Sequence, residues 1–354
     1  MPFEVIETPD ALAEVMELRT SVVYELLLSI RTLLKPARWH EAWAERARSS
    51  ISPELLEELT YLYHNFSEGG LYFELPVDYA DHGDVRGFFR YMRNLSDADF
   101  MFYLLGRVIS REDMPELLAQ PNAADLLRET IISFNKIYDW YTHNLDMIVG
   151  NIPAFKARLL KAWERYWDTF LSNELGTLEA CWNIGLQEKG LIMQREGGKA
   201  LYEKITGSDK LPQQVPADMV YTSITFIPVC LLPSRVYKFF GYGNVTLLFD
   251  PQYTEDRRQA VKHAKEEALS ALKALDDETR LKILRLIVQH GNRMHGKNIA
   301  EHLNISASAV SRHLALLKEG GLIVEEPQKN LIAYRFNKET LSQLTDKLLD
   351  YLYG

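Results

Sequence analysis

Three side chains near the end of the chain, Ser308, Ser311 and Arg312, have the types and the spacing to contact the edges of DNA bases. At about 100° per residue they fall, with Ala315, on one side of a helix over 306–318. An arginine can donate two hydrogen bonds to a guanine, and serine hydroxyls can bond to several bases. The small neighbouring side chains would let this helix lie deep in a major groove. The pattern therefore predicts a helix face that contacts DNA.

The opposite side of the same stretch is apolar. Val310, Leu314 and Leu317 recur at i, i+4 and i+7, which places them on one stripe facing a core. Ser306 is a good N-cap, because its hydroxyl can accept a hydrogen bond from an amide of the first turn. We expect the helix to end at Gly320-Gly321, where glycine permits a left-handed backbone.

The flanking segments predict the rest of a helix-turn-helix with a β-hairpin wing. A helix over 297–303 turns Ile299 and Leu303 inward, and two strands are expected over 321–324 and 332–336. Residues near the helix ends and in the wing would meet phosphates or the minor groove. These candidates are Ser306, Lys297, Lys318, Lys329, Asn330, Arg335 and His313. For His313 a structural role inside the helix-turn-helix remains open, and for the wing residues a solvated hairpin.

These motifs resemble the ArsR-type winged-helix regulators. Residues 274–286 resemble the opening helices of that family, and Val310-Ser311-Arg312-His313-Leu314-Ala315-Leu316-Leu317 matches its recognition helix. Residues 341–353 resemble the last helix, which in this family pairs with the first helix to form a dimer. The resemblance covers about the last ninety residues and implies a homodimer that binds double-stranded DNA at a palindromic operator.

The metal sites known in that family do not carry over to this sequence. The positioning-helix cysteines fall on His295 and Lys297, and the last helix carries Asp346 and Asp350 but no histidine. Borderline metals need thiolate or imidazole ligands. His290, His295 and His302 are spaced by five and seven residues, which does not place all three on one helical face. We therefore expect no metal site and no cofactor.

The remaining sequence predicts a mainly α protein, with an irregular helical N-terminal domain and a small β-sheet before the winged helix-turn-helix. The expected parts are a helical regulatory, effector or dimerisation domain over 1–206, a β-rich segment over 207–254, a connecting helix over 255–275 and the DNA-binding domain over 276–354. Helices are expected over 10–34, 39–48, 54–66, 84–94, 97–109, 114–119, 123–148, 152–175, 179–195 and 199–205. Strands are expected over 3–6, 219–226, 235–240 and 244–249.

Two groups of aromatic residues stand out in the helical part. Trp163, Tyr166 and Trp167 lie at i, i+3 and i+4. Tyr141 lies in a similar stripe with Tyr138 and Leu145, and Trp140 lies beside that stripe. One interpretation is an aromatic-lined pocket for a small-molecule effector. The other is an ordinary helix core, which aromatic residues at helical spacing form more often.

Composition and charge restrict the class of protein. The net charge is −9, but the segment from Asp276 onward has eleven basic and ten acidic residues, so the excess acid lies upstream. No stretch is apolar enough to cross a membrane, and the N-terminus has no secretion signal. We expect a cytoplasmic protein in which Cys181 and Cys230 are buried free thiols. No catalytic motif is present, so we expect no enzyme.

Together these features predict a bacterial DNA-binding transcriptional regulator, a homodimeric repressor controlled by an unknown effector through its N-terminal domain. The alternative is a winged-helix module that docks a protein partner without specific DNA binding. The sequence Glu325-Glu326 at the base of the wing favours this alternative, because acidic side chains repel phosphates.

Overall fold

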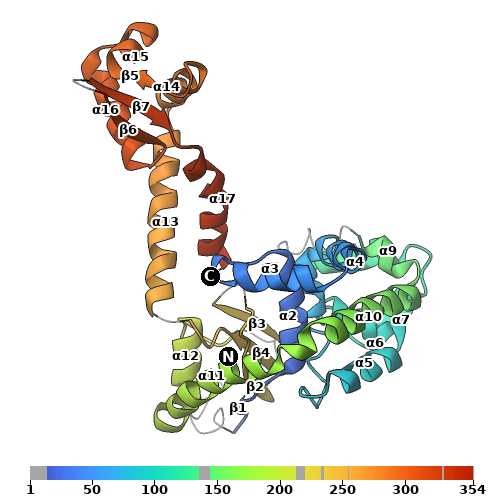
Figure 1. Cartoon of the computed structure of the whole chain (residues 1–354). Coiled ribbons are helices and arrows are strands. Elements are labelled where there is room, and N and C mark those ends of the chain that lie inside the picture. Colours follow the sequence, from blue (N-terminus) through green and yellow to red (C-terminus); the bar gives the residue numbers. More distant parts are fainter. Residues whose placement is uncertain are drawn as a thin grey trace, which may run out of the picture. The chain divides into compact units, whose positions relative to one another are not determined.

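The computed structural model describes residues 14–134, 144–212, 220–232, 235–253, 255–328 and 331–353. The chain forms two compact units, Met1–Gln252 and Tyr253–Gly354 (Figure 1). The first unit is helical with one small sheet, and the second is a winged helix-turn-helix, which confirms the expected mainly α fold class. None of the helices in the described ranges combines the length and apolarity needed to span a bilayer.

Most helices of the first unit share one large apolar core, in which the side chains of α2 are almost all buried. The α-helices are α2 (Val22–Leu34), α3 (Glu41–Ser50), α4 (Pro53–His64), α5 (Val85–Asn94), α6 (Asp97–Leu104), α7 (Met114–Leu118), α8 (Ala123–Phe134), α9 (Leu145–Val149), α10 (Ile152–Thr169), α11 (Leu175–Glu196) and α12 (Gly198–Thr206). Short 3-10 helices are η1 (Arg38–His40), η2 (Ser67–Tyr72) and η4 (Leu171–Asn173). The helix expected over 123–148 is not continuous in the described residues, because α8 ends at Phe134.

The sheet of the first unit has the order β1-β2-β4-β3. Its strands are β1 (Met16–Leu18), β2 (Ser223–Pro228), β3 (Val236–Gly241) and β4 (Asn244–Phe249). β1, β2 and β4 are parallel, and β3 pairs antiparallel with β4. The hairpin between β3 and β4 turns at Tyr242 and Gly243, with φ of 50° and 81°, as a two-residue turn of this kind requires.

The start of the first helix was predicted wrongly. Residues 16–18 were expected inside a helix over 10–34, but they form β1, because their backbone pairs with β2. The helix begins only at Val22, where the Ser21 hydroxyl accepts a hydrogen bond from the Tyr24 amide. The strand expected over 3–6 lies outside the described residues. Strand pairing with a partner two hundred residues away cannot be read from a local pattern.

The two cysteines are joined by a disulfide, with Cα atoms 6.2 Å apart. The prediction of free thiols was therefore wrong, although both residues are buried as expected. Cys181 lies on α11 and Cys230 follows β2, so the fold brings together residues 49 positions apart. Beside the disulfide, the buried carboxylate of Glu25 accepts hydrogen bonds from Trp182 Nε1 at 2.7 Å, Cys230 N at 2.9 Å and Leu231 N at 2.7 Å.

Glu25 makes the stability of the first unit depend on pH. Burial raises the pKa of its carboxyl from 4.5 to about 7, against the three hydrogen bonds, which favour the charged form. Because the folded-state pKa lies above the unfolded one, the stabilisation from protonated Glu25 is complete below pH 4.5 and is lost as the pH rises through 7.

We expect the difference in unfolding free energy between the wild type and Glu25→Gln to fall by roughly 3 kcal/mol from pH 4.5 to pH 8. Denaturant titrations followed by tryptophan fluorescence at several pH values measure this difference. Taking the difference cancels the titration of all other groups. A difference that stays constant over this range would contradict the assignment.

The second unit consists of two packed helices and a compact winged domain. Its elements are α13 (Glu255–Leu275), α14 (Glu278–Gln289), β5 (Met294–His295), α15 (Gly296–Leu303), α16 (Ala307–Glu319), β6 (Ile323–Gln328), β7 (Leu331–Phe336) and α17 (Lys338–Tyr353). The sheet order is β5-β7-β6, and β5 was not predicted. Figure 1 shows α13 and α17 side by side, where Ala268 and Ala271 pack on Leu344 and Lys347 pairs with Glu267 at 2.6 Å.

Candidate nucleic-acid interface

The predicted recognition helix is α16. Ser306 is its N-cap, and its hydroxyl accepts a hydrogen bond from the Ala309 amide at 3.2 Å. Val310, Leu314 and Leu317 are buried in the core of the winged domain. The helix is held by its apolar stripe, as the sequence predicted.

The outward side of α16 carries the residues proposed to contact bases. Ser308, Ser311, Arg312 and Ala315 are all exposed. Arg312 forms no ion pair among the described residues, so its guanidinium is available to a ligand. This side of the helix is small, polar and singly charged, which suits close approach to a DNA groove.

The turn before α16 has a left-handed residue, Asn304, with φ of 52°. Ile299 on α15 is buried beneath this turn, and Leu303 packs against the same core. Directly before α15, Met294 and His295 of β5 pair with Tyr334 and Ala333 of β7. The helix pair α15–α16 is thus fixed to the wing by backbone pairing as well as by the core.

The carboxyl end of α16 lies very close to α13. A Cβ atom added to Gly320 would lie 2.7 Å from Ala274 Cβ, 3.1 Å from the Ser270 carbonyl oxygen and 3.2 Å from Ala271 Cα. Two of these neighbours are backbone atoms, so a side chain at this position would require one helix to move. The left-handed conformation expected at the helix end is found at Gly321, with φ of 68°.

Gly320→Ala is expected to destabilise the second unit by about 1–3 kcal/mol through overpacking. Gly296→Ala is the matched control, because its Cβ would meet Leu314 Cδ1 at 3.5 Å, an ordinary contact. Hydrogen exchange followed by mass spectrometry should show faster exchange of the α16 amides in Gly320→Ala alone. Equal exchange in both variants would show that α13 and α16 can separate at no cost.

Several basic side chains of the winged domain are paired with acids. Lys318 Nζ lies 2.6 Å from Glu325 Oε2, and Arg335 Nε lies 2.9 Å from Glu326 Oε1. Arg293 also pairs with Glu326. The sequence showed these acids but not their partners. Arg335 meets Glu326 through the register of the β6–β7 hairpin, whereas Lys318 comes from α16 and Arg293 from the residue before β5. Lys297, by contrast, is exposed and has no ion pair among the described residues.

His313 faces the interior of the domain. Its Nδ1 lies 3.7 Å from an oxygen of Asp277, whose carboxylate caps α14 by accepting the Arg280 amide at 2.9 Å. The neighbouring Arg280 is buried and donates to the carbonyl oxygens of Ala274 and Lys273, at 2.6 and 2.8 Å. Arg280 therefore joins the end of α13 to the start of α14, a role that sequence reasoning missed.

The structure describes Arg335 of the wing but not the residues at the tip of the wing. The candidates Lys329 and Asn330 lie outside the described residues. Leu331 and Ile332 next to the tip are 61% and 46% exposed. A partner that binds the wing would therefore contact apolar as well as polar side chains.

Comparison with known proteins agrees with this geometry. The family model described as "Bacterial regulatory protein, arsR family" matches residues 277–324, which run from the cap of α14 into β6. The transcriptional repressor SdpR of Bacillus subtilis (strain 168) is 35% identical over 83 residues, covering 23% of this chain and 90% of the relative. The chain belongs to the ArsR family of bacterial regulatory proteins. It is a transcriptional regulator with a DNA-binding helix-turn-helix.

A second ArsR relative is the cadmium resistance transcriptional regulatory protein CadC homolog of Staphylococcus aureus. It is 26% identical over 104 residues, covering 29% of this chain and 85% of the relative. The residues of this chain do not fit the cysteine-based metal site of the family, since the corresponding positions hold His295 and Lys297. In the described ranges, no three histidine, cysteine or acidic residues are grouped to hold a metal.

The aromatic residues proposed for effector binding lie in different places. Trp163 and Tyr166 are fully buried on α10, and the Trp163 ring packs against Tyr72 and Phe88 at centroid distances of 5.5 and 6.3 Å. Trp167 is partly buried at the edge of the same core. Trp140 and Tyr141 lie outside the described residues. The contacts of Trp163 and Tyr166 are those of a helix core.

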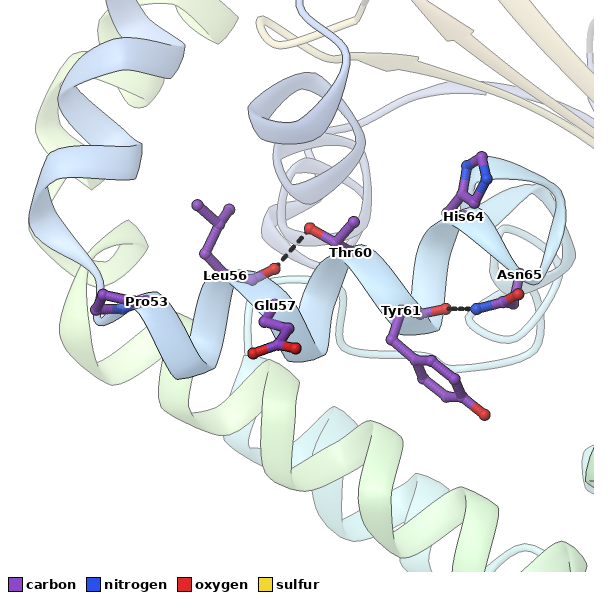
Figure 2. A pocket seen from close by; sticks show the side chains of 7 residues that line it. All are labelled: Pro53, Leu56, Glu57, Thr60, Tyr61, His64 and Asn65. Atoms are coloured by element: carbon purple, nitrogen blue, oxygen red, sulfur yellow. Dashed lines mark hydrogen bonds between the residues drawn. The ribbon is translucent and has the colours of Figure 1, made fainter.

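Figure 2 shows a pocket on the outer side of α4, with a volume of about 510 Å³. It is lined by Pro53, Leu56, Glu57, Thr60, Tyr61, His64 and Asn65. Thr60 Oγ1 and Asn65 Nδ2 donate to the carbonyl oxygens of Leu56 and Tyr61, at 2.7 and 2.9 Å, so these donors are used within the helix. Of the proposed aromatic residues that the structure describes, Trp163, Tyr166 and Trp167, none lines it.

Proposed function

We propose that this ArsR-family chain is a sequence-specific repressor that binds a palindromic operator as a homodimer. The observation that carries the proposal is the exposed face of α16, which presents Ser308, Ser311 and Arg312 together with the small side chain of Ala315. The printed name of the relative SdpR, a transcriptional repressor, supports repression. A repressor acts by occupying its operator, so the contacts that give affinity also give function.

The contacts divide into two kinds. Arg312, Ser308 and Ser311 contact base edges in the major groove, where arginine prefers guanine. Phosphate contacts that carry no sequence information hold the helix in place. These come from Lys297 and Ser306, with Lys329 and Asn330 as further candidates in the wing. Lys318 and Arg335 can contribute only when they leave Glu325 and Glu326. His313 acts indirectly, by packing against Asp277 at the start of α14.

The helix pair α13–α17 supports a homodimer. Leu269 and Leu272 on α13 are 43% and 39% exposed and lie three residues apart, on one side of the helix. Leu341 on α17 is 42% exposed. Covering these leucines with a second copy of the chain removes apolar surface from water, which favours association. Dimerisation also fixes the distance between the two recognition helices.

Regulation is proposed to come from the first unit. Only five residues separate the end of β4 at Phe249 from the start of α13 at Glu255. A ligand with different affinities for two conformations of the first unit could thereby change the arrangement of the dimer. This would change the affinity of the dimer for DNA. Pro53, Leu56 and Tyr61 in the pocket of Figure 2 offer an apolar surface for such a ligand.

Selection of DNA fragments from a random pool tests this proposal. The full chain should enrich a palindrome with half-sites one helical turn apart, about 10–10.5 base pairs, or a multiple of it. Sedimentation of the free protein should show two chains per particle. Absence of any enriched sequence would favour the alternative, a winged helix that docks a protein partner, to which the acidic Glu325 and Glu326 would be suited.

Replacing Glu325 and Glu326 with glutamine is expected to strengthen binding to DNA of any sequence. The change frees Lys318, Arg335 and Arg293 from their ion pairs, so more cations can neutralise phosphates. The slope of log K against log salt should steepen by about 1–3, since each new phosphate contact adds about 0.9. Titrations with unrelated DNA at several salt concentrations measure this slope. Glu301→Gln plus Glu319→Gln is the control with equal charge change, and an equal slope change in this control would contradict the role of the pairs.

A further inference from the structure

Two exposed histidines of the winged domain lie next to each other. His290 is the C-terminal cap of α14, and His302 lies in the last turn of α15. Their ring centroids are 5.0 Å apart and the rings are inclined at 77°. They are twelve residues apart in the sequence, on two different helices. Helical spacing alone therefore gave no reason to pair them.

The hydrogen bonds of both rings fix which nitrogen carries the proton. His290 Nδ1 lies 2.9 Å from the Leu286 carbonyl oxygen, and His302 Nδ1 lies 2.8 Å from the Asn298 carbonyl oxygen. A carbonyl oxygen can only accept, so each Nδ1 must donate its proton. In the neutral ring, the lone pair then lies on Nε2. Histidines that bind metals are arranged in this way, with the other nitrogen donating to a carbonyl or carboxylate.

We propose that His290 and His302 form a two-imidazole site for a divalent transition-metal ion of the zinc, nickel or copper type. Imidazole is a preferred ligand for these ions. With Zn–N bonds of about 2.0 Å and tetrahedral angles, two coordinated rings have centroids roughly 5 Å apart, which matches the observed separation. Both rings also lie at helix C-termini, whose partial negative charge favours a cation.

The site is open. No third histidine, cysteine or acidic side chain completes a metal-binding group here in the residues that the structure describes. Water would fill the remaining positions, so the ion would exchange readily and bind more weakly than in a four-ligand structural site. A bound ion would join the end of α14 to the end of α15, and so stabilise the helices beside α16. The site lies away from the cysteine positions of the family, His295 and Lys297.

Calorimetric titration of the metal-free full chain with zinc chloride tests the site without any DNA. We expect one ion per chain at the tightest site, and at least tenfold weaker binding in His290→Ala and in His302→Ala. His295→Ala is the matched control, because His295 Nδ1 donates to the Ile332 carbonyl oxygen at 2.9 Å and the ring has no part in the pair. Its affinity should equal that of the wild type.

Hydrogen exchange gives a second, independent readout. Zinc should slow exchange of the amides over 286–303 in the wild type and in His295→Ala, but not in His290→Ala or His302→Ala. Circular dichroism checks that the alanine variants are folded, which their exposed positions favour. Wild-type zinc affinity in both His290→Ala and His302→Ala would overturn the proposal. So would the absence of zinc binding to the wild type at millimolar zinc. Either result would leave the DNA-binding function untouched.

Discussion

Arg312→Ala is expected to weaken binding to the specific operator by about 1–3 kcal/mol, roughly a 5- to 150-fold rise in Kd. The guanidinium is exposed at the middle of the outer face of α16 and has no ion pair among the described residues. It therefore has no structural role that alanine would disturb, and alanine is a good helix former. Loss of a two-bond contact to guanine should also relax specificity at one position of each half-site.

Two further variants separate base contact from charge. Arg312→Lys keeps the charge but cannot form the forked pair of hydrogen bonds, so specificity should fall more than affinity for unrelated DNA. Arg285→Ala removes an exposed arginine from α14, outside the recognition helix, and should leave specificity unchanged. Quantitative gel-shift titrations at fixed salt measure all three. An Arg312→Ala protein with wild-type affinity and specificity would remove Arg312 from the contacts.

Reduction of the Cys181–Cys230 disulfide is expected to lower the unfolding free energy of the first unit by about 4 kcal/mol, from the entropy of a loop of this length. The bond joins α11 to the segment after β2, which Glu25 also holds through the Cys230 and Leu231 amides. Thr32 Oγ1 donates to the Leu231 carbonyl oxygen at 2.7 Å in the same place. These bonds remain after reduction, so the unit should stay folded but become less stable.

Tryptophan fluorescence reports on the first unit alone, because all six tryptophans precede residue 253. Urea titrations with and without a dithiol reductant therefore isolate the effect of the bond. In the double variant Cys181→Ala/Cys230→Ala the reductant should change nothing. Two alkylatable thiols in the denatured, unreduced protein would show that the bond does not form.

The features that the sequence predicted are those set by local patterns. The stripe of Val310, Leu314 and Leu317 and the cap at Ser306 are properties of one helix, so α16 was predicted almost to the residue. The second wing strand, expected over 332–336 and found as β7 over Leu331–Phe336, followed from its own residues in the same way. The first was expected over 321–324 but forms β6 over Ile323–Gln328, so only its start was predicted. The match to a known family then indicated how these pieces assemble.

The features that were missed depend on residues far apart in the sequence. Cys181 and Cys230 pair only because α11 passes beside the end of β2. His290 and His302 meet through the turn between two helices, and Glu326 meets Arg335 through the register of a hairpin. The carboxylate of Glu25 is buried because three donors from two other segments surround it. None of these contacts leaves a periodic signal in the chain.

The most direct test of DNA recognition is a titration of the full chain with DNA from upstream of its own gene. The competitor is the same fragment with its sequence scrambled, at one fixed salt concentration. We expect the upstream DNA to bind at least about 10³-fold more tightly than the scrambled DNA, as specific regulators do. Equal affinity for both fragments would contradict sequence-specific recognition by α16.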